Sequence, residues 1–523
     1  MTHEAQLEAI KSGYRFEGAS IKLGVALNQG QPEPSAQVAL PLAMMNRHGL
    51  IAGATGTGKT KTLQLLAEQL SSNGVAVFLA DIKGDLSGLA ASGQANEKLT
   101  ARTSALGQDW QAKAFPTEFY TLGAEGTGVP IRATIESFGP ILLSRIMDLN
   151  STQESALQLI FHYADQKELE LFNLADLRAL IQYLTSDEGK TELEGIGGVS
   201  KATAGVILRG LVTLEAEGLA AFFGEPEFDA AEFLRLAPDG RGLIHILELA
   251  NLQAKPQLFS TFLMWLLAEL FADLPEVGDS DKPKLVFFLD EAHLLFNGSS
   301  KAFKEAITQT VRLIRSKGVG LFFITQTPKD LPAEVLGQLA NRVQHALRAF
   351  TPEDQKALAA TVRTFPQSGY DLEEVLTSAG TGEAVVTVMT ETGAPSPVAL
   401  TRMFAPESLM DTAPEALAAV VAASSIMPKY ATTLDSYSAY EKLTEKEKAA
   451  APQQAAEEAG SGQGPSKEEK AQAKAEAQEA QRRAKAQERE RQKRNDALMR
   501  VGTNVASQIG RQLVRSLFGT KRR

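Results

Sequence analysis

The sequence predicts an α/β fold with a mostly parallel central sheet, an all-α insertion and a helical, low-complexity C-terminal tail. Short, continuous apolar runs recur along the chain and end in polar residues, which is typical of parallel strands buried on both faces. From residue 139 to 214 the apolar spacing is helical instead, and glycine turns separate the pieces. Beyond residue 440, large apolar residues become rare until the last segment of the chain.

The composition is that of an ordinary globular protein. Of the 523 residues, 44 % are hydrophobic and 22 % are charged. The absence of cysteine excludes disulfides and cysteine-based zinc sites. The N-terminus lacks the pattern of a signal peptide, and the most apolar helical stretch, residues 259–271, is too short to span a bilayer. We therefore expect a cytoplasmic protein without an integral membrane segment.

The net charge of −10 is unevenly distributed. Residues 441–523 carry 19 basic and 12 acidic side chains, whereas the preceding 440 residues carry 34 and 51. Such an acidic body argues against a broad basic face that binds DNA. A basic channel inside a ring stays compatible with it, because the local lining can differ from the net charge.

The first 45 residues contain one apolar alternation, at residues 21–27, and predict a short β segment. A glycine-rich loop then lies between a short apolar strand at residues 48–52 and a helix at residues 60–70. It matches G-x-x-x-x-G-K-[ST], a pattern whose backbone N–H groups surround a phosphate. Lys59 can reach the β- and γ-phosphates, and the Thr60 hydroxyl can complete a Mg²⁺ shell. The predicted nucleotide-binding residues are Gly53, Ala54, Thr55, Gly56, Thr57, Gly58, Lys59, Thr60 and Lys61.

The next apolar strand, residues 75–80, delivers Asp81 and Asp85 to the carboxyl edge of the predicted sheet. These acids belong either to the nucleotide site or to an ordinary acidic loop.

A later apolar strand runs directly into Asp290 and Glu291. We expect Asp290 to hold Mg²⁺, directly or through water, and Glu291 to act as the general base on the attacking water. The tetrapeptide at residues 290–293 also suggests a DEAH-box helicase. We reject that interpretation, because no second domain with an arginine-rich glycine motif follows residue 404. His293 is expected to form a local hydrogen bond.

Further along, residues 299–317 predict an amphipathic helix with one basic face, which is either solvated or directed at a neighbouring subunit or DNA. The strand at residues 319–325 ends at Gln326, a polar residue placed to sense the γ-phosphate. The strand at residues 343–350 carries Arg348, and residues 383–389 and 397–404 predict a terminal hairpin.

In this order, the motifs resemble those of the HerA–FtsK group of P-loop ATPases, and more narrowly of bacterial HerA-like proteins of the YjgR type. The resemblance covers roughly residues 20–405. It is carried by HGLIAGATGTGKTKTLQ, FLADIKGDLSGL, GPILLSRIMDLNSTQESAL, VFFLDEAHLLF, RLIRSKGVGLFFITQTP and NRVQHALRAFTPEDQKAL.

The resemblance implies a RecA-like ASCE fold and a homo-hexameric ring that binds ATP and Mg²⁺ between subunits and acts on double-stranded DNA. It assigns catalytic roles to Lys59, Glu291 and Gln326, and an arginine acting across the interface, either Arg348 or Arg315. HerA proper carries an N-terminal barrel that binds a nuclease, whereas about 45 residues precede the loop here, so we do not expect a nuclease partner.

These features divide the chain into successive segments: a β segment (1–45), a first stretch of the ATPase core (46–138), a helical insertion (139–214), a second stretch of the ATPase core (215–405), a helical linker (406–440), a charged low-complexity helix or disordered stretch (441–496) and a basic amphipathic helix (497–523). The last helix docks on the body or a partner, or binds a membrane or nucleic acid. Two function classes stay open: a DNA-translocating motor, and an ATP-driven assembly or switch protein that acts on a protein or membrane surface.

Overall fold

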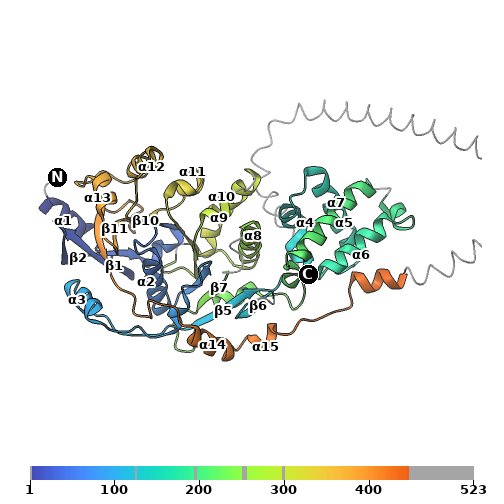
Figure 1. The fold of residues 1–523 in the computed structure, drawn as a ribbon, viewed down its shortest axis with the longest axis horizontal. Coiled ribbons are helices and arrows are strands. Elements are labelled where there is room, and N and C mark those ends of the chain that lie inside the picture. Colours follow the sequence, from blue (N-terminus) through green and yellow to red (C-terminus); the bar gives the residue numbers. More distant parts are fainter. Residues whose placement is uncertain are drawn as a thin grey trace, which may run out of the picture. The chain divides into compact units, whose positions relative to one another are not determined.

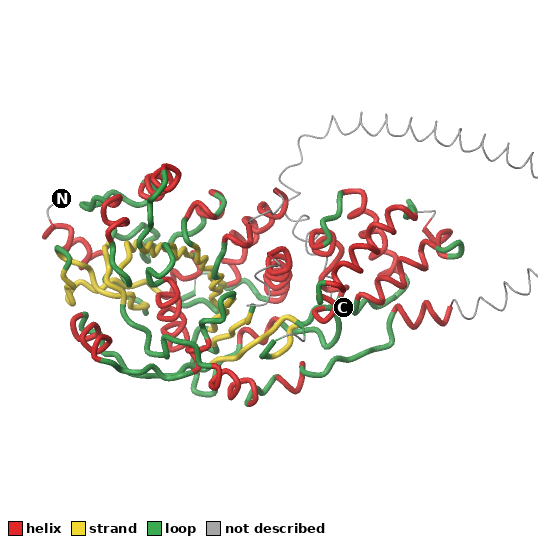
Figure 2. The backbone as a smooth tube through the Cα atoms, in the orientation of Figure 1, coloured by secondary structure: helices red, strands yellow, loops and turns green. Residues whose placement is uncertain are grey.

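The computed structural model describes residues 3–123, 126–193, 197–249, 256–278, 280–296 and 301–446. Its contacts divide the chain into a core unit (Met1–Thr134 and Thr213–Asp435) and a helical unit (Ile135–Val212 and Ser436–Arg523). The strands of the described residues belong to the core unit, whereas the elements described in the helical unit are helical (Figures 1 and 2). The predicted basic helix at 497–523, and the predicted low-complexity segment after residue 446, lie outside the described residues.

One twelve-stranded sheet organises the core unit, in the order β2-β1-β12-β11-β10-β3-β9-β8-β4-β7-β5-β6. Neighbouring strands from β10 to β6 are parallel, and those from β2 to β10 are antiparallel. This confirms a mostly parallel sheet and the terminal hairpin. The strands are β1 Ser20–Asn28, β2 Gln31–Pro41, β3 Gly49–Ala52, β4 Ala76–Asp81, β5 Thr117–Leu122, β6 Val129–Ile131, β7 Ile244–Glu248, β8 Leu285–Leu289, β9 Val319–Thr325, β10 Asn341–His345, β11 Glu383–Thr387 and β12 Ala399–Met403.

Helices cover the sheet or build the helical unit (Figure 1). They are α1 His3–Gly13, α2 Lys59–Ser72, α3 Glu97–Ala105, α4 Ile135–Ile146, α5 Ser151–Gln166, α6 Leu174–Thr185, α7 Lys201–Ala216, α8 Pro256–Asp273, α9 His293–Phe296, α10 Lys301–Ile314, α11 Ala333–Leu336, α12 Pro352–Val362, α13 Leu372–Ser378, α14 Pro414–Ala422 and α15 Met427–Tyr430. Within the described residues, none of these helices is both long and apolar enough to cross a membrane.

The N-terminal β segment is part of the main sheet. β1 pairs with β12 and with β2, so the two strands extend the sheet at its antiparallel edge. Helix α1 precedes them and was not predicted. Its Ile10 is buried in the core, as is Tyr14 directly after the helix, and the Tyr14 hydroxyl donates to the Val386 carbonyl oxygen at 3.0 Å.

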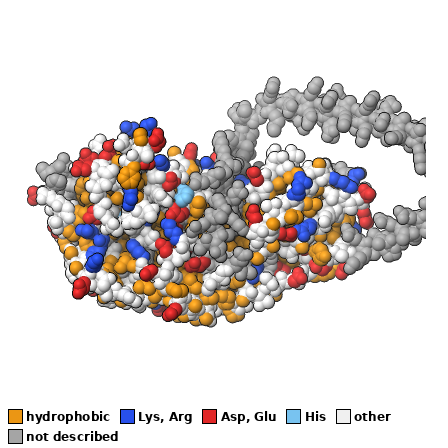
Figure 3. All heavy atoms as spheres, in the orientation of Figure 1, with side chains coloured by type: hydrophobic (Ala, Val, Ile, Leu, Met, Phe, Trp, Pro, Cys, Tyr) orange, Lys and Arg blue, Asp and Glu red, His pale blue; other side chains and the backbone are white. Residues whose placement is uncertain are grey.

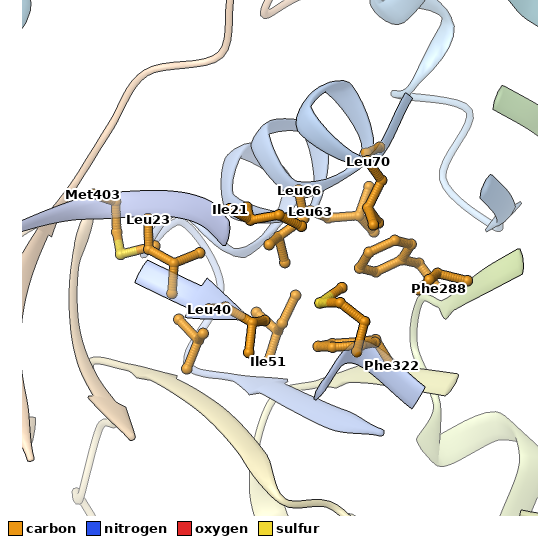
Figure 4. Packing of buried hydrophobic residues seen from close by; sticks show 14 of the residues in the cluster. Ile21, Leu23, Leu40, Ile51, Leu63, Leu66, Leu70, Phe288, Phe322 and Met403 are labelled. Atoms are coloured by element: carbon orange, nitrogen blue, oxygen red, sulfur yellow. The ribbon is translucent and has the colours of Figure 1, made fainter. Parts of the chain in front are cut away.

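Helix α2 packs across the centre of one face of the sheet (Figure 4). Its Leu63, Leu66 and Leu70 are buried over β-strand residues that include Ile51 and Phe322. These leucines follow the helical spacing seen in the sequence, so one apolar stripe fixes the helix against the strands. Because α2 begins directly after the glycine-rich loop, this packing also fixes the position of the loop.

Alternating strand residues cover the opposite face of the sheet. Phe78 and Phe287 lie 4.8 Å apart between ring centroids, and Phe233 packs edge-on against Phe78. On β11, Val386 points to the α2 side, whereas Val385 joins a separate cluster beneath α12 and α13. The sheet is therefore buried on both faces, which explains why its parallel strands read as unbroken apolar runs.

Residues 405–411, here called the strap, are fastened to α2. The buried carboxylate of Glu68 accepts hydrogen bonds from the backbone N–H groups of Glu407 (2.7 Å) and Ser408 (2.9 Å), and from the Ser408 hydroxyl. Gln64 donates to the Leu409 carbonyl oxygen at 2.8 Å. Burial raises the pKa of Glu68 to about 7. The strap is therefore bound to the buried carboxyl group of Glu68, whose pKa lies near neutral pH.

We expect Glu68→Gln to change how stability depends on pH. A folded pKa of about 7, raised above the ordinary value, means that the contribution of Glu68 is complete below about pH 4.5. It is lost as the pH rises to about 7. In melting experiments, the variant should therefore gain stability relative to the wild type between pH 5 and 7.5. A constant difference in Tm across this range would contradict the assignment.

Candidate nucleotide-binding and hydrolysis site

The glycine-rich loop runs from β3 to α2 at the carboxyl edge of the sheet. Its backbone is fixed to both neighbouring strands: Gly53 N–H donates to the Thr325 carbonyl oxygen (3.2 Å), and Ala54 N–H donates to the Ala346 carbonyl oxygen (2.8 Å). Gly56 has a φ of 78° and Gly58 a φ of 115°, which side chains rarely adopt. The loop therefore needs glycine for its conformation, as the sequence pattern predicts.

Lys59 reaches back over this loop. Its buried ammonium group donates to the carbonyl oxygens of Gly53 (2.7 Å) and Ala54 (3.1 Å). Burial lowers the pKa of Lys59 and nearby Lys83 lowers it further, while Glu291 and Asp290 act in the opposite direction. A phosphate placed against the loop would give this desolvated cation an anionic partner.

The remaining predicted loop residues have distinct positions. Thr57 donates its hydroxyl to the Ala54 carbonyl oxygen at 2.7 Å, and its own carbonyl oxygen accepts from Gly382 N–H at 2.9 Å. Thr55 is exposed in the turn, and Thr60 is partly exposed at the start of α2. The Lys61 ammonium group donates to the Met410 carbonyl oxygen at 2.5 Å, so this side chain is bound to the strap.

The acidic residues lie at the end of β8. Asp290 is buried, and Glu291 has a φ of 46°, in the left-handed region that non-glycine residues seldom occupy. The sheet order places β9 between β3 and β8, so one strand separates the glycine-rich loop from the acidic residues. A triphosphate bound by the loop would have these carboxylates one strand away, an arrangement suited to metal binding and water activation.

Lys83, in the loop after β4, pairs with both acidic residues. Its ammonium group lies 2.7 Å from Glu291 Oε1 and 3.3 Å from Asp290 Oδ2. Burial opposes ionisation of Glu291, but the hydrogen bond and charge of Lys83 outweigh it, with His293 and Lys59 adding to the effect, so the pKa of Glu291 is lowered. For Asp290 burial prevails over Lys83, and its pKa is raised.

Gln326 follows β9 and is exposed at the same edge of the sheet. The turn around it is held by Asp330, whose carboxylate accepts from the Thr325 hydroxyl (2.7 Å) and from Thr327 N–H (3.1 Å). The two candidate arginines are both exposed but lie at opposite edges. Arg348 comes two residues after Ala346, which bonds the glycine-rich loop, whereas Arg315 precedes β9 in the short turn η7 (Arg315–Lys317).

Two further residues belong to this site although the sequence did not single them out. Lys83 was overlooked because it lies between two aspartates that seemed the more reactive groups. His345 is fully buried beneath the loop, where one ring nitrogen pairs with the Thr62 hydroxyl (2.9 Å) and the other with the Glu383 carbonyl oxygen (2.9 Å). Burial lowers the pKa of His345 to about 4, so it is a neutral support for the loop. No local pattern marks this residue.

Comparisons with known proteins agree with the fold and with the family resemblance. The family model described as helicase HerA-like C-terminal matches residues 26–523. The DNA double-strand break repair helicase HerA of Sulfolobus acidocaldarius is 21 % identical over 388 residues, covering 71 % of this chain and 67 % of the relative. The protein of the same name from Saccharolobus solfataricus is 22 % identical over 392 residues, covering 73 % and 69 %.

A solved structure of plasmid coupling protein TrwB in complex with ADP and Mg²⁺ also matches. It is 16 % identical, covers 77 % of this chain and 94 % of TrwB, and has a TM-score of 0.50. The similarity concerns the fold, and it confirms the RecA-like P-loop architecture around the glycine-rich loop.

Proposed function

The chain belongs to the helicase HerA-like C-terminal family, and on this premise we propose that it is a Mg²⁺-dependent ATPase that forms a ring and moves along double-stranded DNA. The observation that carries the hydrolytic role is the assembly of Lys59, Lys83, Asp290 and Glu291 at one edge of the sheet. The DNA role rests on the relatives, which are named as DNA double-strand break repair helicases.

The residues at this edge fit a magnesium ion. Asp290 and Thr60 offer a carboxylate and a hydroxyl oxygen, the hard donors that Mg²⁺ prefers. Asp290 already lies 3.3 Å from the ammonium group of Lys83, so its carboxylate accommodates a cation. When bound, Mg²⁺ would neutralise charge on the phosphate oxygens.

Residues of this chain would bind the phosphates and activate the attacking water. The glycine-rich loop and Lys59 would hold the phosphates, and Glu291, at the end of β8, would lie beside the γ-phosphate. There its carboxylate accepts a proton from the attacking water. Exposed Gln326, directly after β9, would orient that water or sense the phosphate. In a ring, an arginine of the neighbouring subunit would complete the site.

The charge of the molecule limits how DNA would bind. On the face shown in Figure 3, acidic and basic side chains are interspersed over the core unit, without one continuous basic field. DNA contact through a channel lined by a few basic side chains is consistent with this surface and with the acidic charge of the first 440 residues.

The decisive experiment is the ATPase rate of the full chain with and without duplex DNA at several salt concentrations. We expect Mg²⁺-dependent hydrolysis that DNA stimulates several-fold, with a stimulation that declines steeply as salt increases, because phosphate contacts release counterions. Glu291→Gln serves as the background control. An ATPase rate that no form of DNA changes would contradict the proposed DNA motor and favour an assembly or switch protein. No hydrolysis in the wild type would contradict the enzyme itself.

A further inference from the structure

Lys83 forms an ion pair with the carboxylate of Glu291, the group that hydrolysis would require as general base. Its ammonium group lies 2.7 Å from Glu291 Oε1, whereas the other oxygen, Oε2, lies 3.2 Å from His293 Nδ1 without a hydrogen bond to it. A general base must present a free oxygen to the water that it deprotonates. The pairing of Lys83 with Oε1 restrains the whole carboxylate, so Oε2 is not free to turn towards a water and Glu291 is held in a resting arrangement.

The loop that carries Lys83 is built to hold that position. The Asp81 carboxylate is fully buried and accepts hydrogen bonds from the backbone N–H groups that follow it, at Lys83 (3.1 Å), Gly84 (2.7 Å), Asp85 (3.3 Å) and Leu86 (2.9 Å). The loop therefore wraps around its own aspartate as a rigid base. The aspartate shapes the loop, and the lysine is the group that the loop presents to the site.

The Lys83 side chain is more exposed than its partners. The exposed fraction of the Lys83 side chain is 37 %, against 8 % for Asp290 and 13 % for Glu291. A lysine side chain is long and flexible, so it can exchange one anionic partner for another without moving its backbone.

Binding of a metal–triphosphate complex changes the charges around this ammonium group. A divalent cation at Asp290 repels Lys83, whereas a γ-phosphate brings negative charge to the same place. A diphosphate supplies no such anion at that position.

Resting on the proposed ATPase function, we propose that Lys83 is the positioning residue that distinguishes a nucleoside triphosphate from a diphosphate. Without a γ-phosphate, Lys83 holds Glu291 in an ion pair. When a γ-phosphate binds the Lys83 ammonium group instead, the Glu291 carboxylate is free to accept a proton from water. Hydrolysis removes the γ-phosphate, and Lys83 returns to Glu291. The site is thereby active only when a triphosphate is bound.

Equilibrium binding tests this without depending on turnover. Affinities for ADP and for the non-hydrolysable analogue AMPPNP, both with Mg²⁺, are measured for the full-length wild type, Lys83→Met and Lys83→Arg. We expect Lys83→Met to weaken AMPPNP binding about tenfold, as for loss of one charge-assisted contact, and to change ADP binding less than about twofold. Lys83→Arg should keep most of the preference. Lys11→Met, which removes a partly exposed lysine paired with Glu8 at 3.0 Å, is the matched control.

A double-mutant cycle with Glu291→Gln shows whether the two residues compete. Removal of the Glu291 charge should tighten AMPPNP binding several-fold, and this gain should largely disappear when Lys83 is also methionine. Equal effects of Lys83→Met on both nucleotides, or an unchanged gain in the double variant, would overturn the proposal. If the wild type binds neither nucleotide, the proposed ATPase function fails as well, so the two failures are distinguishable.

Discussion

Glu291→Gln is expected to reduce the steady-state rate of phosphate release by about 10²–10³-fold while leaving nucleotide bound. The amide keeps the size of the side chain but cannot accept a proton from water. Its backbone, at a φ of 46°, follows β8, which is buried on both faces, so the substitution should not displace the strand end. Phosphate release and equilibrium nucleotide binding, measured on the same preparation, separate the chemical step from binding.

Glu248→Gln is the matched control for this variant. Glu248 ends β7, two strands away from β8 at the same edge of the sheet, and it is partly buried. Burial, together with Asp81 and Asp85, raises the pKa of Glu248 to about 7, so the control also removes a perturbed acid. Its turnover should stay within about threefold of the wild type. Near-normal hydrolysis by Glu291→Gln would show that another group takes the proton.

The sequence was informative wherever function depends on a short stretch of chain. The glycine-rich loop needs fixed glycines and a lysine within eight residues, and Asp290 and Glu291 follow directly on an apolar run. Both features are local, and the structure brings them to one edge of the sheet. The fold class could be predicted for the same reason, because the apolar residues follow one spacing in the buried strands and another in the helical region between them.

What could not be predicted depends on neighbours distant in sequence. The insertion of β9 between β3 and β8 is a pairing of segments that lie far apart along the chain, and no local pattern encodes it. The same holds for His345, whose partners come from α2 and β11. In the loop after β4, the acids looked reactive in sequence, but Asp81 is occupied by backbone N–H groups and Lys83 faces the site.

The position of the two arginines leads to a further expectation about ring assembly. A ring of identical subunits joined head to tail uses two different surfaces, one of which carries the subunit's own nucleotide site. Arg348 lies beside that site, two residues after the bond between Ala346 and the glycine-rich loop. Arg315 lies at the other end of β9, about 20 Å along a seven-residue strand. We therefore expect Arg315 to act in the neighbouring subunit's site.

Arg315→Ala should then lower kcat by about 10³-fold or more without weakening nucleotide binding, because a trans-acting arginine stabilises charge that develops only during phosphoryl transfer. Arg348→Ala, which also changes an exposed arginine, should lower kcat less than about tenfold and is the control.

Mixing two inactive variants provides the sharper measurement. Arg315→Ala subunits keep an intact loop, and Lys59→Met subunits keep an intact arginine, so each is inactive alone. In equal random mixtures about a quarter of the interfaces combine the two intact halves, and a matching fraction of activity should return. If the mixture stays inactive while both variants assemble, Arg315 acts within its own subunit or not at all.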